Sequence, residues 1–278
     1  MIIAVASGKG GTGKTTIAVN LALSIQDVQI LDVDVEEPNV GVFLHSTQTE
    51  EHEVFVSVPK INDERCTYCG ACAEFCAYNA LAVVNKQVLV FPELCHACTG
   101  CELVCPVDAV GWKKRGIGWI RNGKTAEGIE IIEGELAVGE AMAVPVIKAV
   151  KQQLKRSKKI IIDAPPGTSC PMIESIQDAD FVLLVTEPTP FGLHDLKLAV
   201  EVVRALHLPF GVVINRDGIG DSQVDMYCQK EKIPILLRVP HDKTIANLYS
   251  NGQACVTEMP EIKQQFLNLY EKIRRRRP

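Results

Sequence analysis

Ten residues near the start of the chain, Ser7–Thr16 with the sequence S-G-K-G-G-T-G-K-T-T, leave little freedom in how it can fold. They follow the apolar run Ile2–Val5 and match G-x-x-x-x-G-K-[ST], a phosphate-binding loop between a strand and a helix. Glycines let backbone N–H groups approach phosphate oxygens at distances that side chains would block. The helix expected to begin at Lys14 would direct its positive end at the same charge.

The loop predicts specific contacts with a nucleotide. Lys14 is expected to reach the β- and γ-phosphates, and the Thr15 hydroxyl is expected to ligate Mg²⁺. A glycine-rich turn without a ligand is the alternative, and the position of the motif between an apolar run and a helix disfavours it. The predicted nucleotide-binding residues of the loop are Gly8, Lys9, Gly10, Gly11, Thr12, Gly13, Lys14, Thr15 and Thr16.

The string K-G-G-T-G-K-T-T resembles the deviant P-loop of the MinD/ParA/Mrp ATPases, a family that includes the nitrogenase iron protein. The resemblance implies an α/β fold with a mostly parallel sheet of the SIMIBI, MinD-like class. It also implies that ATP is the nucleotide and that a homodimer closes on ATP. In this family the extra lysine, here Lys9, reaches the nucleotide of the other subunit. A solvated lysine without that role is the alternative.

Two acidic segments extend the resemblance. Val28–Val33 predicts a buried strand that delivers Asp32 and Asp34 to the edge of the sheet where ligands of open α/β sheets bind. This D-x-D resembles the first switch of the family, and we expect Asp34 to position the attacking water. Capping of the following turn is the alternative role. Asp163, which ends a predicted strand, resembles the acid that holds Mg²⁺ through water.

A second switch and a single cysteine follow that strand. Pro165-Pro166-Gly167-Thr168 resembles the switch that senses the γ-phosphate, and Cys170 follows it. In the nitrogenase iron protein a cysteine at this place binds a cluster shared between subunits, together with a second cysteine from an earlier loop. The chain has no cysteine between Cys105 and Asp163, so a buried or redox-sensitive thiol is the favoured interpretation.

The adenine pocket is predicted from two later strands. Asn215 follows the apolar run Gly211–Ile214 and resembles the asparagine that hydrogen-bonds adenine in this family, a task suited to the paired donor and acceptor of an amide. A turn asparagine is the alternative. Ile235–Pro240 is expected to carry the opposite wall of the pocket.

Eight of the eleven cysteines form an internal repeat. Cys66-x2-Cys69-x2-Cys72-x3-Cys76 returns 29 residues later (95 − 66 = 29) as Cys95-x2-Cys98-x2-Cys101-x3-Cys105-Pro106. This spacing is typical of a bacterial ferredoxin with two [4Fe–4S] clusters, in which the fourth cysteine of each block binds the other cluster. Zinc, which has no use for a third cysteine at this spacing, is the weaker alternative. One departure is Ala77, where such ferredoxins usually have proline. The predicted ligand sets are Cys66, Cys69, Cys72 and Cys105 for one cluster and Cys95, Cys98, Cys101 and Cys76 for the other.

The ferredoxin-like segment divides the chain. We predict an ATPase domain in two parts, residues 1–60 and 113–278, with a small α+β ferredoxin domain inserted at 61–112. Strands are expected at Glu53–Val58, Lys159–Asp163 and Phe181–Val185, helices at Pro145–Arg156 and Leu193–Leu206, and a hairpin of Ile117–Ile120 with Ile129–Ile132 through Asn122-Gly123.

Composition restricts the partners. A net charge of −5 argues against a general nucleic-acid binder, and 47% apolar residues is ordinary for a globular protein. No apolar run is long enough for a membrane span and no signal peptide precedes the loop, so a cytoplasmic protein is expected. A C-terminal helix from about Pro260 ends in Arg274–Arg277. We expect it to close the sheet, and a MinD-like membrane anchor is the alternative.

The favoured hypothesis is an ATP-hydrolysing, ATP-dependent homodimer whose nucleotide state gates electron transfer through two [4Fe–4S] clusters to an unknown redox partner. The alternative is an Mrp-type ATPase that assembles or delivers clusters to an acceptor protein. A third hypothesis, a MinD-like positioning ATPase, leaves the cysteines unexplained. Cobyrinate amidation, suggested by a label often given to such chains, would need a glutamine amidotransferase domain that does not follow the ATPase.

Overall fold

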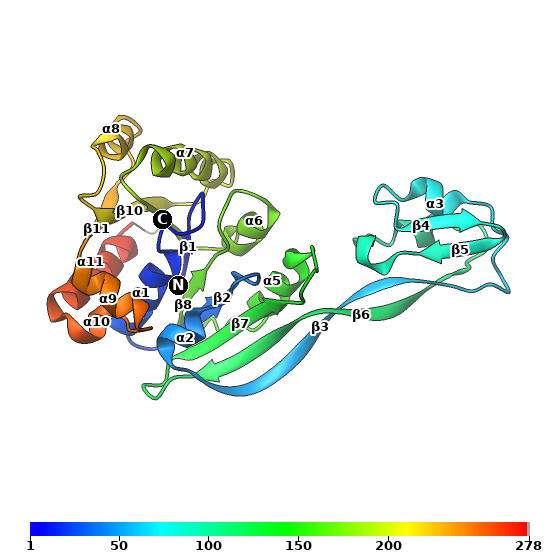
Figure 1. The fold of residues 1–278 in the computed structure, drawn as a ribbon, viewed down its shortest axis with the longest axis horizontal. Helices are drawn as coiled ribbons and strands as arrows, with labels where there is room; N and C mark the ends of the chain where they lie inside the picture. The colour runs from blue at the N-terminus through cyan, green and yellow to red at the C-terminus, as the bar shows by residue number, and fades with distance from the viewer. Residues whose placement is uncertain (277–278) are drawn as a thin grey trace.

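The computed structural model describes residues 1–276, and the last predicted arginine, Arg277, lies outside this range. Within it, a nine-stranded sheet has the order β11-β10-β9-β1-β8-β2-β7-β6-β3 (Figure 1). Strands from β11 to β7 run parallel, whereas β6 and β3 are antiparallel additions at one edge. The strands are β1 (Ile2–Ala6), β2 (Val28–Asp32), β3 (Thr47–Ile61), β6 (Val110–Lys124), β7 (Glu130–Leu136), β8 (Lys159–Asp163), β9 (Phe181–Thr186), β10 (Phe210–Asp217) and β11 (Ile235–Pro240). The predicted α/β fold is confirmed.

Helices cover both faces of the parallel strands because those strands are apolar on both sides. Along β1, Ile2 and Ala4 belong to one core cluster while Ile3 and Val5 belong to the other, as the two-residue period of a strand requires. The helices of this body are α1 (Lys14–Ser24), α2 (Val40–Leu44), α5 (Ala143–Lys151), α6 (Cys170–Ile176), α7 (Pro190–Ala205), α8 (Gln223–Lys230), α9 (Lys243–Ser250), α10 (Cys255–Glu258) and α11 (Pro260–Arg274).

The C-terminal helix α11 closes the core beside α1. Its apolar residues Phe266, Leu269 and Ile273 are buried in the same cluster as Ile17 of α1. The apolar face that an anchor would need is therefore used by the core. No helix within residues 1–276 has the length and apolar character needed to cross a bilayer.

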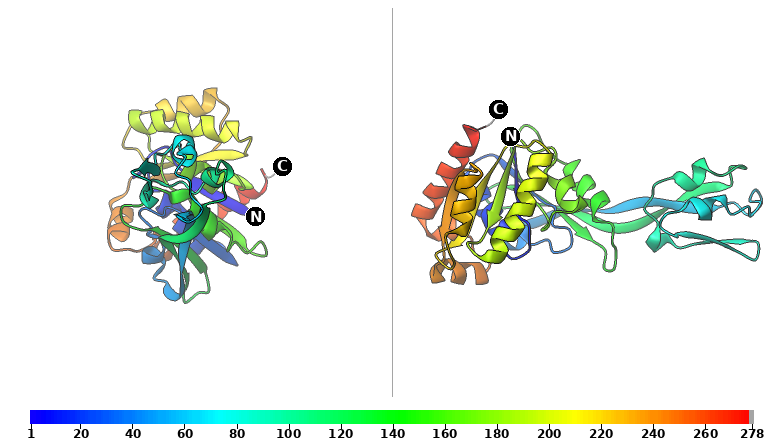
Figure 2. Two further views of the ribbon diagram at one scale, coloured as in Figure 1. Left: turned by 90° about the vertical axis from the view of Figure 1, so that its right-hand side faces the viewer. Right: turned by 90° about the horizontal axis from the view of Figure 1, so that it is seen from above.

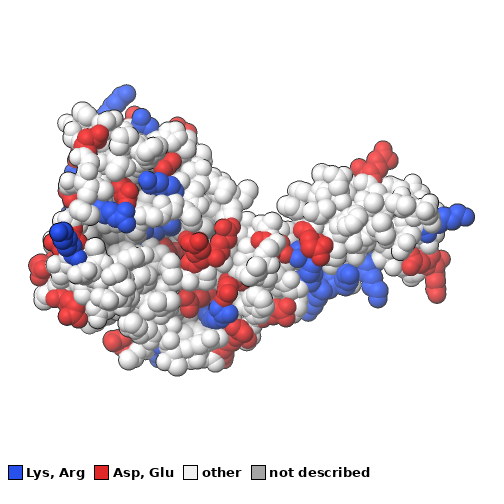
Figure 3. All heavy atoms as spheres, viewed as in Figure 1, with Lys and Arg blue, Asp and Glu red and all other residues white. Residues whose placement is uncertain are grey.

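The strands β3 and β6 leave the body as a long two-stranded ribbon (Figure 1). Each has 15 residues, which corresponds to a length of roughly 50 Å. Their paired register runs from Thr47 opposite Lys124 to Ile61 opposite Val110. Exposed Lys60, Lys113 and Lys114 lie on the outer half of the ribbon, where Figure 3 shows basic side chains gathered beside the small lobe. The predicted strand Glu53–Val58 is the middle of β3.

Residues 62–109 form a small lobe at the far end of the ribbon (Figure 2). It contains the two-stranded sheet of β4 (Leu81–Val84) and β5 (Gln87–Val90), the helices α3 (Ala71–Phe75) and α4 (Gly100–Leu103), and the 3₁₀ turn η1 (Pro92–Leu94). The predicted boundaries of the insertion, 61 and 112, fall within the ribbon strands.

Two local predictions are wrong in their boundaries. The hairpin of β6 and β7 turns at residues 125–129 rather than at Asn122-Gly123, because Thr125 N–H donates to the Ile129 carbonyl at 3.0 Å and Gly128 takes φ +89°. Helix α5 ends at Lys151 instead of Arg156. The buried side chain of Gln29 accepts a hydrogen bond from Lys155 N at 2.8 Å and donates to the Gln153 carbonyl at 3.1 Å, which fixes a non-helical segment there.

Candidate functional site

The phosphate-binding loop connects β1 to α1, as the sequence predicts. Gly11 and Gly13 have φ of +77° and +89°, backbone angles that residues other than glycine rarely adopt. A Cβ on Gly13 would lie 2.3 Å from Nδ2 of Asn215. The loop thus needs glycine for its backbone shape and for the close approach of β10.

A cavity of about 360 Å³ opens in front of this loop and of the first turn of α1. It is lined by predicted residues from five parts of the sequence, and a further wall comes from the segment after β11. Its predicted members are Gly10, Gly11, Gly13, Lys14, Thr15, Thr16, Asp34, Pro166, Asn215 and Pro240, and the added members include Arg216, His241, Asp242, Ile245 and Tyr249. The cavity has the phosphate-binding backbone at one end and Ile245 and Tyr249 at the other.

Two buried carboxylates lie below the loop on neighbouring strands. Asp32 and Asp163 are paired residues of β2 and β8, and Thr15 Oγ1 donates to Asp163 Oδ2 at 2.5 Å. Burial, together with the repulsion between the two acids, raises the pKa of Asp32, and burial raises the pKa of Asp163 against the opposing effects of Thr15 and Lys14. The other oxygen of Asp163, Oδ1, is buried without a hydrogen-bond partner in residues 1–276. Hard oxygen donors in a site of excess negative charge are what Mg²⁺ binds, so these residues fit that ion.

The first switch begins where Asp32 ends β2. Its carboxylate accepts hydrogen bonds from the backbone N–H groups of Asp34, Asn39 and Val40 at 3.1, 2.9 and 3.0 Å. Asp32 therefore fixes the backbone of residues 34–40, while Asp34 lines the cavity. Burial raises the pKa of Asp34 to about 6, although Lys14 opposes the shift.

The cysteines of the small lobe surround two separate cavities. Cys66, Cys69, Cys72 and Cys105 line one, and Cys76, Cys95, Cys98 and Cys101 line the other. These are the two predicted sets, with the fourth cysteine exchanged between blocks. No group of three or more His, Cys, Asp or Glu side chains in the described part of the chain has the close arrangement of a metal site.

Backbone N–H groups donate to four of these sulfurs, and the donors in the second block lie 29 residues after those in the first, as the cysteines do. Tyr68 N–H donates to Cys66 Sγ and Ala97 N–H to Cys95 Sγ, both at 3.4 Å. Ala80 N–H and Ala109 N–H donate to Cys76 Sγ and Cys105 Sγ at 3.4 and 3.2 Å. Such donors stabilise thiolates, and hydrogen bonds to sulfur are one of the means by which proteins adjust cluster potentials. The donor set and its surroundings therefore fit two iron–sulfur clusters.

Comparison with known proteins identifies the family. Residues 3–255 match the family described as the CobQ/CobB/MinD/ParA nucleotide binding domain. The chain belongs to this family. An uncharacterized protein of Methanocaldococcus jannaschii, MJ0579, is 34% identical over 264 residues, which cover 91% of both chains. The iron-sulfur cluster carrier protein of Pyrococcus horikoshii is 26% identical, over 98% of this chain and 84% of the relative.

A solved structure shares the fold. The septum site-determining protein MinD of Pyrococcus horikoshii, complexed with Mg-ADP, superimposes with a TM-score of 0.61 at 20% identity, over 98% of this chain and 95% of that one. This MinD/ParA-type P-loop ATPase fold, together with the cavity, supports nucleotide binding by the chain. The roles of individual residues remain predictions.

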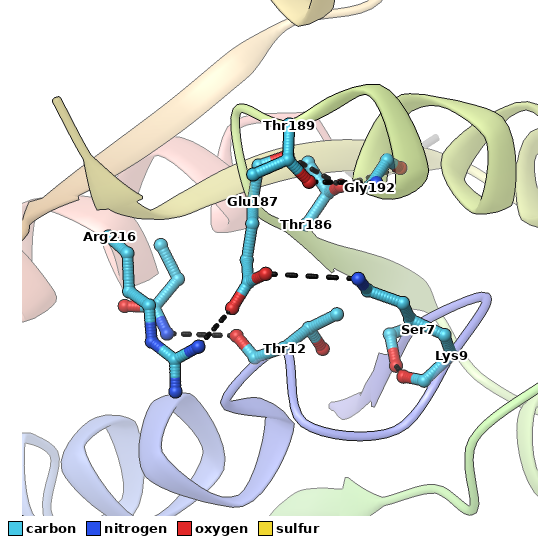
Figure 4. Close-up of polar contacts among 9 residues, drawn as sticks. Ser7, Lys9, Thr12, Thr186, Glu187, Thr189, Gly192 and Arg216 are labelled. Atoms are coloured by element: carbon cyan, nitrogen blue, oxygen red, sulfur yellow. Dashed lines mark hydrogen bonds and ion pairs between the residues drawn. The ribbon is translucent and has the colours of Figure 1, made fainter. Parts of the chain in front are cut away.

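Lys9 and Asn215 make contacts in this ATPase that the sequence did not predict. Lys9 Nζ lies 3.8 Å from Glu187 Oε2 and points toward that carboxylate (Figure 4), and Lys9 is not among the residues that line the cavity. Asn215 lines the cavity, but its Nδ2 donates to the Thr12 carbonyl at 2.8 Å and so supports the loop. Its Oδ1 takes no part in that hydrogen bond.

Three other residues singled out in the sequence, Gly8, Gly167 and Cys170, do not line the cavity. Gly8 is excluded from the cavity because α7 packs on it so closely that a Cβ would lie 2.1 Å from the Asp195 carbonyl oxygen. Gly167 of the second switch has φ +97° and donates its N–H to the Ser7 carbonyl at 3.0 Å. Cys170 is exposed at the start of α6, so the first of its two predicted interpretations, a buried thiol, is wrong, and the second, a redox-sensitive thiol, stays a prediction.

Sequence reasoning missed much of the wall opposite the loop. Of the predicted segment Ile235–Pro240, only Pro240 lines this wall within the described residues. The other residues of the wall come after that strand in the sequence. Asp242 begins α9 by accepting from Thr244 N at 2.6 Å, which places Ile245 and Tyr249 on the cavity. The string P-H-D before an amphipathic segment is the helix-start pattern that could have identified it.

Proposed function

We propose that this chain is an ATPase whose nucleotide state governs a redox-active lobe, and that it works as a homodimer closed by ATP. The observation that carries the proposal is that each of two cavities is lined by one complete set of four cysteines drawn from both repeats. The clusters that these cysteines would hold supply storage and transfer of single electrons.

For hydrolysis, the chain's own residues supply binding and orientation. Lys14 and the loop N–H groups would bind the β- and γ-phosphates, and Thr15 and Asp163 are the residues that would hold Mg²⁺, which would neutralise charge on the phosphates. Asp34 accepts a hydrogen bond from the water that attacks the γ-phosphorus, and Asn215 Oδ1 faces the adenine. Lys9 contacts the phosphates bound by the partner subunit, as in the family it resembles.

A continuous set of contacts supports coupling between the cavity and the lobe. Asp32 holds Val40 at the start of α2, and Gly41 N–H in the same helix donates to Glu133 Oε1 on β7 at 3.0 Å. The ribbon strand β3 begins three residues after α2 ends (47 − 44 = 3). Movement of α2 during the nucleotide cycle is thus transmitted to the base of the ribbon.

The second candidate is an ATPase that carries iron–sulfur clusters to acceptor proteins. The name of the Pyrococcus horikoshii relative, iron-sulfur cluster carrier protein, favours it. Eight cysteines in two complete sets, with N–H groups directed at the sulfurs, favour resident clusters instead. A cargo that must leave needs fewer and more exposed ligands.

The deciding experiment uses anaerobically purified full-length protein. Iron and sulfide are counted, and the steady-state ATPase rate is measured with the lobe oxidised and then reduced by dithionite. About eight irons per chain, stable to chelator, with an ATPase rate that changes several-fold on reduction, support gated electron transfer. Irons that pass to an apo-ferredoxin support the carrier. Zinc in place of iron contradicts both.

A further inference from the structure

Glu187 is a buried acid at the end of β9 that the proposed hydrolysis does not use. Its side chain is 9% exposed and both of its carboxylate oxygens face cations. Oε2 lies 3.8 Å from Lys9 Nζ, and Oε1 accepts from Arg216 Nη1, as Figure 4 shows. One carboxylate therefore joins the P-loop to the end of β10.

The position of this acid determines where Lys9 points. Lys14 lines the nucleotide cavity, whereas Lys9, five residues earlier in the same loop, is not among its lining residues and points toward Glu187. The Lys9 side chain remains 32% exposed, so it can leave Glu187 without unfolding the loop. In this structure, Lys9 is paired with an acid of its own subunit, Glu187.

The second cation keeps Glu187 in place. Arg216 adopts φ +53°, follows Asn215, and itself lines the cavity. Because Glu187 also forms an ion pair with Arg216, the carboxylate keeps a compensating charge when Lys9 moves away. Without Arg216, the departure of Lys9 would leave a buried charge unpaired, and the cost of that would hold Lys9 in place.

We infer that Glu187 is a positioning residue for the P-loop lysine: it holds Lys9 in its own subunit and releases it only when the phosphates of a partner subunit compete for the same ammonium group. This inference rests on the proposed ATP-dependent homodimer. The fraction of chains with Lys9 free sets the apparent affinity for dimer closure, so Glu187 raises the nucleotide concentration at which the dimer forms.

The test replaces the carboxylate with its neutral isostere, Glu187→Gln. Dimer formation is followed by light scattering across a titration with Mg²⁺ and a non-hydrolysable ATP analogue. The concentration for half-maximal dimerisation is expected to fall roughly three- to tenfold. Glu231→Gln, which removes a partly exposed acid paired with Arg204 at 2.7 Å, is the matched control and leaves that concentration unchanged.

A second readout examines the monomer directly. Without nucleotide, the rate at which acetic anhydride modifies the Lys9 amine is measured by mass spectrometry and is expected to rise in Glu187→Gln but not in Glu231→Gln. The double variant Lys9→Ala/Glu187→Gln is expected to need more analogue than the wild type. If Glu187→Gln fails to fold, Glu187→Asp, which retracts the carboxylate, is expected to give a smaller shift in the same direction.

The outcomes separate the two proposals. A wild-type chain that stays monomeric at saturating analogue contradicts the ATP-dependent dimer and, with it, the role of Glu187. A wild type that dimerises, while Glu187→Gln needs as much analogue or more, overturns only the positioning role. The positioning role is also overturned if Lys9→Ala/Glu187→Gln dimerises at as low an analogue concentration as Glu187→Gln. The lowered concentration would then not depend on Lys9.

Discussion

The body and the small lobe are stabilised in different ways. In the body, strands such as β1 and β9 are buried along their whole length between two layers of helices. In the lobe, the apolar cluster has Leu81, Cys101 and Val110 as its buried members, with other cysteines packed around them. Domains of fewer than roughly 70 residues usually need disulfides or metals. The body folds on its apolar core, and we expect the lobe to depend on the clusters bound by its cysteines.

The largest expected effect lies in the body and should leave the lobe intact. Lys14→Ala removes the ammonium group from the phosphate end of the cavity, and ATPase activity is expected to fall about 100-fold or more. Iron content should stay at the wild-type level. A steady-state assay with parallel iron analysis checks both. Loss of iron in this variant would show that the two regions do not fold separately.

Removal of iron is the converse experiment. Anaerobic oxidation of the clusters with ferricyanide in the presence of a strong chelator removes iron that the chelator alone leaves in place, and it should unfold the lobe, so that limited proteolysis cleaves within residues 62–109 while the body remains protected. Nucleotide binding by the body should change little. Mass spectrometry of the fragments locates the cuts. Equal protection of the lobe before and after chelation would contradict its dependence on metal.

A single cysteine tests the assignment of ligand sets. Cys98→Ser changes a thiol of one predicted set, and the iron content is expected to fall to about half because the other cavity keeps four cysteines. Cys170→Ser, which removes an exposed thiol of the body, is the control and should keep all the iron. Complete loss of iron in Cys98→Ser would mean that the two sites fold as one unit.

The connection between the regions depends on Glu133. Glu133→Ala removes the acceptor of the Gly41 N–H, and the ratio of ATPase rates with oxidised and reduced lobe is expected to approach one. The rate itself should change less than about threefold, since Glu133 does not line the cavity. Glu130→Ala on the same strand, which loses ion pairs to Lys155 and Lys158 and keeps the Glu133 acceptor of the Gly41 N–H, is the control. A redox ratio that survives in Glu133→Ala would exclude this route.

The sequence predicted the features that depend on local pattern. Buried strands such as Lys159–Asp163 are apolar runs, the loop is a motif with fixed glycines, and the cysteine repeat carries its own spacing. It did not predict contacts between distant segments. The ion pairs of Glu187 join residues far apart in the chain. Gln29, which lies on β2, bonds the backbone of Lys155 and so fixes the non-helical segment after α5. The full extent of the ribbon was also missed, because exposed β3 residues from Thr47 to Glu53 carry no apolar alternation.

The smallest expected effect concerns Asp34, whose pKa is raised by burial to about 6 from an ordinary value of 3.8. Because the native chain then holds this proton at a higher pH than the unfolded chain does, its contribution to stability falls as the pH rises through the window from about 4 to 6. Relative to the wild type, Asp34→Asn should therefore gain about 1 kcal/mol of unfolding free energy between pH 5 and 7.5. Urea denaturation at both pH values measures the difference. A constant difference would show that Asp34 titrates as an exposed acid, which would contradict the burial that the proposed orientation of the attacking water by Asp34 relies on.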